Sequence, residues 1–345
     1  MIERMLKPLR FAVTPLLLLA LAAHAGAADA PAAPKVKRVY FVGNSVTDTV
    51  KYGLLADLAK SRGWQMPWGR HVIPGTPLFL PLREAMAGKP SGFTERPYGD
   101  SKQALANHTW DAITLQPFDR LLDNFDAKAG KDEEGDLVTI NRFIALAAAA
   151  SPDVQFYVYA RWPRITVNGK GVSFDREAYD RNVRGVSPPP GTAPAPALAG
   201  PIDDYGTGWL RKYTGGWDGS NESKDYFETL TRAVRGANPR MAKPVRMIPA
   251  GHVIYALDRQ FKAGKLPGYK GAIEDLYADG IHLNNKGSFV VACTFYATIF
   301  QEDPAGLSPK GYQVDDAAFV KLAQRTIWEV VRSHELAGLA TPARR

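Results

Sequence analysis

Val39-Tyr-Phe-Val-Gly-Asn-Ser-Val-Thr-Asp48 joins a short apolar segment of β type to a turn of small polar residues. A helix-compatible segment, residues 49–62, follows this turn. A strand that ends in a tight turn before a helix exposes the side chains of the turn at the edge of a sheet, near backbone N–H groups that can stabilise an anion. Ser45 therefore stands where a serine nucleophile is needed.

Short apolar segments of this kind alternate with helix-type segments along the chain. The predicted strands are 38–42, 71–73, 112–115, 154–159 and 245–248, and the predicted helices are 51–62, 138–150, 226–235, 251–263, a segment after Asn285, and 315–334. Such alternation favours a parallel sheet covered on both faces. We expect an α/β fold with three α/β/α layers and a flavodoxin-like, five-stranded parallel sheet with helices on both faces.

Four residues that could take part in binding or catalysis each follow a predicted strand: Ser45, Gly75, Gln116 and Arg161. The carboxyl ends of parallel strands meet at one edge of a sheet, and ligand sites form there. We therefore expect these four positions to approach a common site.

A second informative stretch lies far downstream, in Tyr277-Ala-Asp279-Gly-Ile-His282-Leu-Asn-Asn-Lys-Gly287, before the next-to-last predicted helix. The hydroxyl of a serine is unreactive unless a base accepts its proton, and His282 is the candidate base. Asp279 could hold the imidazole in the required tautomer. Alternatively, Asp279 is a turn residue before a glycine and His282 a polar residue at the start of a helix.

The order Ser45, Asp279, His282 and the context of these residues resemble the SGNH hydrolase superfamily of GDSL-like esterases and lipases. Gly43-Asn44-Ser45-Val-Thr47 resembles the branch whose first block is G-N-S-x-T. The resemblance covers about residues 39–300. It implies that Ser45 is the nucleophile, His282 the base and Asp279 its partner.

An esterase also needs hydrogen-bond donors for the developing oxyanion. The backbone N–H of Ser45 is one candidate, and the resemblance implies a second at Gly75, which could also be an ordinary Pro-Gly turn. The third donor of the family is an asparagine in a G-x-N-D block, and this chain has Leu115-Gln116 instead. The longer amide of Gln116 could donate in its place or could cap backbone groups.

Arg161 and Trp162 end the fourth predicted strand, where they could bind an acidic or hydroxylated substrate and stack on a sugar face. The alternative is a surface arginine and a packing tryptophan. His71 and His252 lie near strand ends, but neither has the spacing of a metal site. We expect no metal ion and no cofactor.

One segment, residues 163–224, has no clear periodicity and includes the proline-rich stretch 187–196. A stretch of this length is usually an insertion. Its aromatic residues could cover the site as a lid, stack on a sugar or simply pack on the domain; they are Tyr205, Trp209, Tyr213 and Trp217.

The N-terminus has the pattern of a signal peptide, with basic residues at 4–10, an apolar region at 11–23 and the small-residue site Ala25-Gly26-Ala27. We expect cleavage after Ala27 and a periplasmic or secreted protein; the alternative is an uncleaved anchor. The expected organisation is a signal peptide at 1–27, a linker at 28–36, a hydrolase domain at 37–335 with the insertion at about 163–224, and a tail at 336–345.

The net charge and the single cysteine of the chain bear on its partners and on its chemistry. The net charge is +8 for the whole chain, and the charges are interspersed, so we expect no nucleic-acid partner and no membrane contact after signal cleavage. The one cysteine, Cys293, lies in an apolar helical segment and should be a buried, inert thiol. The expected function is a serine esterase acting on a small-molecule or polysaccharide ester, favouring a carbohydrate O-acyl group. The alternative is a non-catalytic ligand-binding module on the same scaffold.

Overall fold

The computed structural model describes most of the chain after residue 34. The described residues are 35–118, 120–123, 134–167, 170–171, 204–215, 219–265 and 272–339. The expected signal peptide, most of the insertion and the end of the tail lie outside them.

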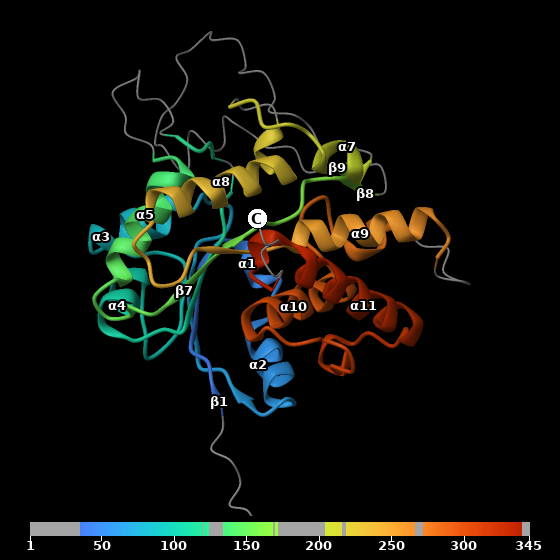
Figure 1. Cartoon of the computed structure of the whole chain (residues 1–345), viewed down its shortest axis with the longest axis horizontal. Coiled ribbons are helices and arrows are strands. Elements are labelled where there is room, and N and C mark those ends of the chain that lie inside the picture. Colours follow the sequence, from blue (N-terminus) through green and yellow to red (C-terminus); the bar gives the residue numbers. More distant parts are fainter. Residues whose placement is uncertain are drawn as a thin grey trace, which may run out of the picture. The chain divides into compact units, whose positions relative to one another are not determined.

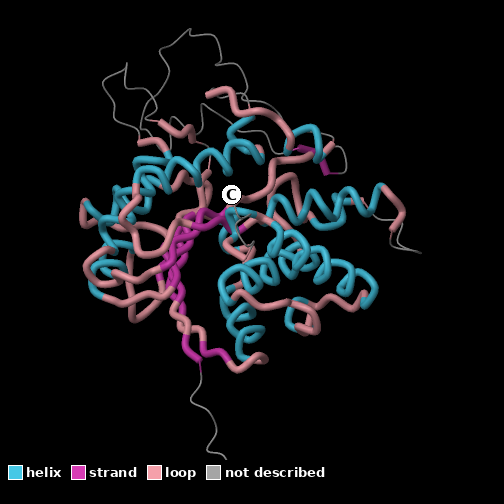
Figure 2. Tube along the Cα trace, viewed as in Figure 1, coloured by secondary structure: helices cyan, strands magenta, loops and turns pink. Residues whose placement is uncertain are grey.

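A six-stranded sheet forms the centre of the domain (Figure 2). Its strands follow the order β10 (Arg246–Ile248), β7 (Gln155–Tyr159), β6 (Ala112–Leu115), β2 (Val39–Gly43), β4 (Trp68–Val72) and β5 (Phe93–Thr94). All neighbours pair in parallel except β4 and β5, which are antiparallel. The side chains of β2, β6 and β7 are buried throughout, as expected for strands covered on both faces.

The expected α/β fold with a mostly parallel sheet is confirmed, but the sheet has six strands rather than five. The additional strand β5 is only two residues long, too short to leave a periodic pattern. The second predicted strand also begins earlier, at Trp68, because its first residues alternate between half-buried and buried and do not form an apolar run. Two small ladders pair β1 (Lys35–Val36) with β3 (Trp64–Gln65) and β8 (Thr166–Val167) with β9 (Lys170–Gly171).

Helices cover both faces of the sheet (Figure 1). One group comprises α2 (Tyr52–Lys60), α9 (Ala250–Lys262), α10 (Asn285–Phe300) and α11 (Ala317–Ser333), and the other α3 (Phe79–Met86), α4 (Ser101–Asn107), α5 (Asp136–Ala147) and α8 (Lys224–Ala237). Shorter elements are α1 (Ser45–Asp48), α7 (Tyr205–Trp209) and the 3₁₀ turns η3 (Ser220–Glu222), η4 (Ile273–Leu276), η5 (Lys310–Tyr312) and η6 (Glu335–Ala337).

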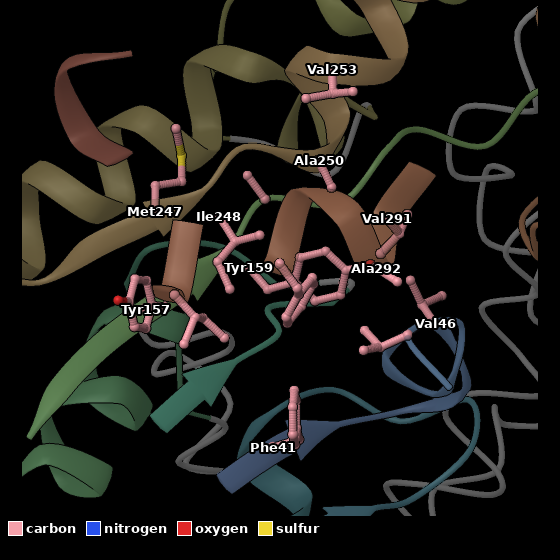
Figure 3. Packing of buried hydrophobic residues seen from close by; sticks show 14 of the residues in the cluster. Phe41, Val46, Tyr157, Tyr159, Met247, Ile248, Ala250, Val253, Val291 and Ala292 are labelled. Carbon is pink, nitrogen blue, oxygen red and sulfur yellow. The ribbon is translucent and has the colours of Figure 1, made fainter. Parts of the chain in front are cut away.

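Helix α10 is the central element of the core because it is buried from Gly287 to Phe300. A helix that is apolar on all sides can only be stable when it is covered on all sides. The ring of Phe295 packs on Tyr159 of the sheet at 4.7 Å, and Figure 3 shows Val291 and Ala292 in the same cluster. Cys293 is fully buried here, which raises the pKa of its thiol and agrees with an inert cysteine. None of the helices in the described ranges is long and apolar enough to cross a bilayer.

Candidate active site

The turn that carries Ser45 is held by its neighbours on both sides. Asn44 caps α1, because its Oδ1 accepts a hydrogen bond from the Val46 amide at 3.0 Å. The Nδ2 group of Asn44 donates to the carbonyl of Thr76 at 2.9 Å, which ties this turn to the turn after β4. At Gly43, a Cβ atom would lie 2.1 Å from Thr47 Oγ1, so only glycine permits so close an approach.

The loop that carries Asp279 and His282 is closed like a small hairpin. Tyr277 and Leu283 form an antiparallel bridge, and the Ala278 amide donates to the His282 carbonyl at 2.8 Å. Directly after the loop, Asn284 caps α10. Backbone hydrogen bonds and the helix cap therefore hold the base of the loop independently of the contacts made by the Asp279 and His282 side chains.

The structure brings the three predicted residues together. His282 Nε2 lies 2.9 Å from Ser45 Oγ, and His282 Nδ1 lies 2.8 Å from Asp279 Oδ2. The other carboxylate oxygen, Oδ1, accepts the amide hydrogens of Ile281 at 2.8 Å and His282 at 2.7 Å. Side-chain exposure is 42% for His282 and 47% for Asp279, so the site is open to solvent.

The environment of Asp279 keeps it charged. Burial by itself raises the pKa of this carboxyl group, but the backbone hydrogen bonds from His282 and Ile281, with the contact to the imidazole, outweigh burial and lower it. An ionised Asp279 accepts a hydrogen from His282 Nδ1, which leaves the Nε2 lone pair facing the Ser45 hydroxyl. This assignment of the imidazole hydrogen follows from the hydrogen-bond network.

Trp162 supports the same loop through a hydrogen bond to its backbone. Its indole N–H donates to the carbonyl of Ile281 at 2.7 Å, between Asp279 and His282 in the sequence. The amide of Ile165 donates to the carbonyl of Gly280 at 3.0 Å. The segment after β7 thus holds the backbone of the loop at two successive carbonyls.

The expected substrate contacts of Arg161 and Trp162 do not agree with their positions, because both residues have no exposed surface. The Arg161 guanidinium donates to Glu222 Oε1 at 2.7 Å and lies 4.5 Å from the centre of the Phe118 ring. Arg164 pairs with the same carboxylate. The end of a strand fixes where a backbone lies, but not the direction of its side chains, which here point into the packed interior.

Gln116 also differs from its expected role as an oxyanion donor. Its Oε1 accepts from the Asn44 amide at 3.3 Å and from Thr47 Oγ1 at 3.0 Å, and its Nε2 donates to the Pro117 carbonyl at 2.9 Å. The amide orientation is determined by the Asn44 N–H, which requires an oxygen acceptor. One N–H of the Gln116 amide is therefore directed to Pro117, and the oxygen of the side chain supports the Ser45 turn.

The backbone candidates for the oxyanion remain Ser45 and Gly75. Ser45 is the first residue of α1, where no carbonyl of the helix can accept its N–H. Gly75 is exposed, has φ +69° and has open space where a Cβ would stand. The bond between Asn44 and the Thr76 carbonyl keeps these two turns next to each other.

Sequence reasoning did not assign Asn44 and Thr47 to the site, and it assigned Trp162 to stacking or packing rather than to support of the loop. An asparagine before the first residue of a helix is a typical N-cap, so the role of Asn44 could have been inferred from the sequence. No local pattern indicates that Trp162 bonds a carbonyl 119 positions away. Of the insertion's aromatic residues, Tyr205 and Trp209 are buried, which indicates packing on the domain; Trp217 lies outside the described residues.

Within the described part of the chain, one group of three side chains has atoms close enough to hold a metal ion: Glu228, His252 and His334. None of the three belongs to the triad. His71 is not part of the group, because its ring contacts Ser101 Oγ and the Ser91 carbonyl.

Comparisons with known proteins give a fold but no family. No family model matches the chain, and no curated protein matches it. Among solved structures, it is similar to a DUF4886 family protein from Bacteroides uniformis, with 17% identity, a TM-score of 0.52, and coverage of 86% of this chain and 95% of that one. At this identity the likeness supports the α/β fold alone.

Proposed function

We propose that this protein is an exported serine esterase of the SGNH type, which hydrolyses an ester through an acyl-enzyme intermediate. One observation carries the proposal: Ser45 Oγ, His282 Nε2, His282 Nδ1 and Asp279 Oδ2 form a continuous line of contacts at 2.9 and 2.8 Å. These are the contacts that a nucleophile, a base and an orienting carboxylate require.

The proposed reaction has two steps. As Ser45 Oγ attacks the ester carbonyl, its proton passes to His282 Nε2, and Asp279 stabilises the imidazolium. Backbone N–H groups of Ser45 and Gly75 stabilise the oxyanion. The imidazolium then protonates the leaving alcohol, and a water molecule, activated by His282, releases the acid from Ser45.

The sheet topology supports a site at this position. We propose that the five parallel strands form a flavodoxin-like arrangement, because they follow the order β4, β2, β6, β7, β10. After β2 the chain adds β4 on one side and later β6 on the other. In open α/β sheets a crevice forms at such a reversal, outside the carboxyl ends of the strands. Ser45 directly follows the carboxyl end of β2.

The substrate we propose is a carbohydrate O-acyl group. Support comes from the signal-peptide pattern of residues 1–27, which favours export, and from the exposed triad, which leaves room for a bulky hydrophilic alcohol. This substrate class rests on the proposed esterase activity.

The test is labelling by a fluorophosphonate probe, together with hydrolysis of p-nitrophenyl acetate. Ser45→Ala should abolish labelling and lower kcat on the order of 10⁶-fold, because Ser45 Oγ is the hydroxyl placed against His282 Nε2. Ser308→Ala, which removes an exposed hydroxyl, is the control. Release of acetate from O-acetylated polysaccharides would then identify the substrate class. A folded wild-type protein that neither labels nor turns over the ester would favour the ligand-binding module.

A further inference from the structure

Three side chains with metal-binding atoms converge where α8 and α9 meet the end of α11. Glu228 lies in α8, His252 in the first turn of α9, and His334 directly after α11. His252 Nε2 lies 3.2 Å from Glu228 Oε1 and 3.1 Å from His334 Nε2, and His334 Nε2 lies 3.5 Å from the same Glu228 oxygen. Their side chains are largely buried, with exposures of 16%, 9% and 13% for Glu228, His252 and His334.

These distances match one face of a metal coordination tetrahedron. A tetrahedral Zn²⁺ ion with nitrogen and oxygen ligands at about 2.0–2.1 Å holds them about 3.3 Å apart. The observed separations of 3.1, 3.2 and 3.5 Å lie around this value. We propose that Glu228, His252 and His334 bind a divalent transition-metal ion of the Zn²⁺ type, whose fourth position is taken by water.

Without a cation, each tautomer arrangement of the cluster leaves, within the described part of the chain, either an unpartnered N–H group or two N–H groups that face each other. The Leu336 amide donates to His334 Nδ1 at 3.2 Å, so a neutral His334 carries its hydrogen on Nε2, facing His252. If His252 accepts that hydrogen, its own lies on Nδ1, a buried atom with no partner among the described residues. If His252 donates to Glu228 instead, two N–H groups oppose each other across 3.1 Å. A metal ion replaces both inner hydrogens and so removes the opposed N–H groups, while His252 keeps a hydrogen on Nδ1.

Binding should have a local structural consequence. A histidine that binds metal through Nε2 carries its hydrogen on Nδ1, so His334 can no longer accept from the Leu336 amide. The turn η6 must therefore adjust. Lys224 and Arg232, which contact Glu228 at 3.7 and 3.2 Å, are 45% and 51% exposed and can turn toward solvent when the ion arrives.

The ligand set is the type that this class of ion prefers. Imidazole nitrogens suit Zn²⁺, Cu²⁺ and Ni²⁺, and a single carboxylate completes a three-ligand set that leaves one position open. Glu228 and His252 lie on α8 and α9, 24 positions apart, and His334 follows α11, 82 positions after His252, so the ion would join these three helices. The proposal is independent of the esterase activity, since it shares no residue with the triad.

The experiment titrates the chelator-treated full chain with ZnCl₂ by calorimetry and with CoCl₂ by visible absorption, which reports tetrahedral coordination. We expect one ion per chain and a shift of the Leu336 amide resonance on Zn²⁺ addition. Glu228→Gln retains the size of the side chain, and His334→Asn retains an oxygen for the Leu336 amide. Each should weaken binding by more than the roughly 10- to 100-fold that loss of an outer partner costs.

Two further variants serve as matched controls. His108→Asn, at the end of α4, should bind as the wild type does, and so should His282→Asn, which removes the histidine of the triad. The proposal is overturned if the wild type binds neither ion saturably, if Glu228→Gln and His334→Asn bind unchanged, or if His282→Asn is the variant that loses the ion. If the ligand variants do not fold, the wild-type cobalt spectrum and the Leu336 shift still decide the question.

Discussion

At residue 116, one amide group connects the third parallel strand to the turn that carries Ser45. Gln116 is buried and accepts hydrogen bonds from the Asn44 amide and from Thr47 Oγ1. Gln116 thus stabilises the backbone and side chains around Ser45 through Asn44 and Thr47. A donor to the oxyanion would instead act only on the transition state.

Gln116→Ala should therefore reduce the free energy of unfolding by about 1–3 kcal/mol, because the buried Asn44 N–H loses its acceptor. Urea denaturation measures this loss, with the exposed Gln103→Ala as the control, for which a change within about 0.5 kcal/mol is expected. Unchanged stability combined with a drop in kcat of about 100- to 1,000-fold would show that Gln116 acts as an oxyanion donor after all.

Asp279 gives the site a pH dependence with a defined sign. The pKa of its carboxyl is raised by burial but lowered on balance by its hydrogen bonds, so the folded state binds a proton less readily than the unfolded state. Its contribution to stability is present above the unfolded pKa of about 4 and is lost as the pH falls through the folded pKa.

We therefore expect the Tm of the wild type to exceed that of Asp279→Asn most clearly above about pH 5, with the gap narrowing below about pH 4. Thermal unfolding followed by circular dichroism across this range tests the effect. Asp315→Asn controls for the loss of one surface charge. A gap that widens on acidification would contradict the lowered pKa.

At the scale of elements, the segment after β7 acts as a brace for the loop before α10. Trp162 and Ile165 donate to the carbonyls of Ile281 and Gly280, so the loop is held from a second direction besides its own hairpin. If the chain is the esterase we propose, the loop must position His282 closely against Ser45, because a misplacement of about 1 Å can cost about 100-fold in rate.

Trp162→Phe keeps a buried aromatic ring but removes the indole donor and one of the two fused rings. If the chain is the esterase we propose, kcat should fall by about 10- to 100-fold with little change in KM, because the position of His282 relaxes. Trp64→Phe is the control: its indole also donates a hydrogen bond, here to the Glu302 side chain at 3.0 Å, but from β3, next to β1. An equal loss of kcat in both variants would indicate a general loss of stability and argue against the brace.

Over the whole molecule, the residue pattern was sufficient for the α/β class, for the strands of the parallel sheet and for the meeting of Ser45, Asp279 and His282. The class and the strands follow from local periodicity and the position of Ser45 from strand-end geometry, whereas the partnership with Asp279 and His282 was implied by the resemblance to the SGNH superfamily. The strand β5 was missed because two residues carry no periodic signal.

Side-chain direction and long-range pairing could not be predicted in the same way. The amide of Gln116 and the rings of Trp162 and Phe118 take their orientation from partners that only the folded chain brings near. The Glu228, His252 and His334 cluster was missed for the same reason, since spacing rules detect ligands within one element and these residues come from three.

The contact between Ser45 and His282 joins positions 237 residues apart, so the two residues become available one after the other during synthesis or export. When the chain leaves a ribosome or a translocation channel from its N-terminus, Ser45 emerges early and His282 emerges only after most of the domain. On the mechanism proposed here, Ser45 would have no base until His282 arrives, and an incomplete chain would be inactive. On the export route proposed here, hydrolysis would begin only after folding beyond the membrane, which protects esters inside the cell without a dedicated inhibitor.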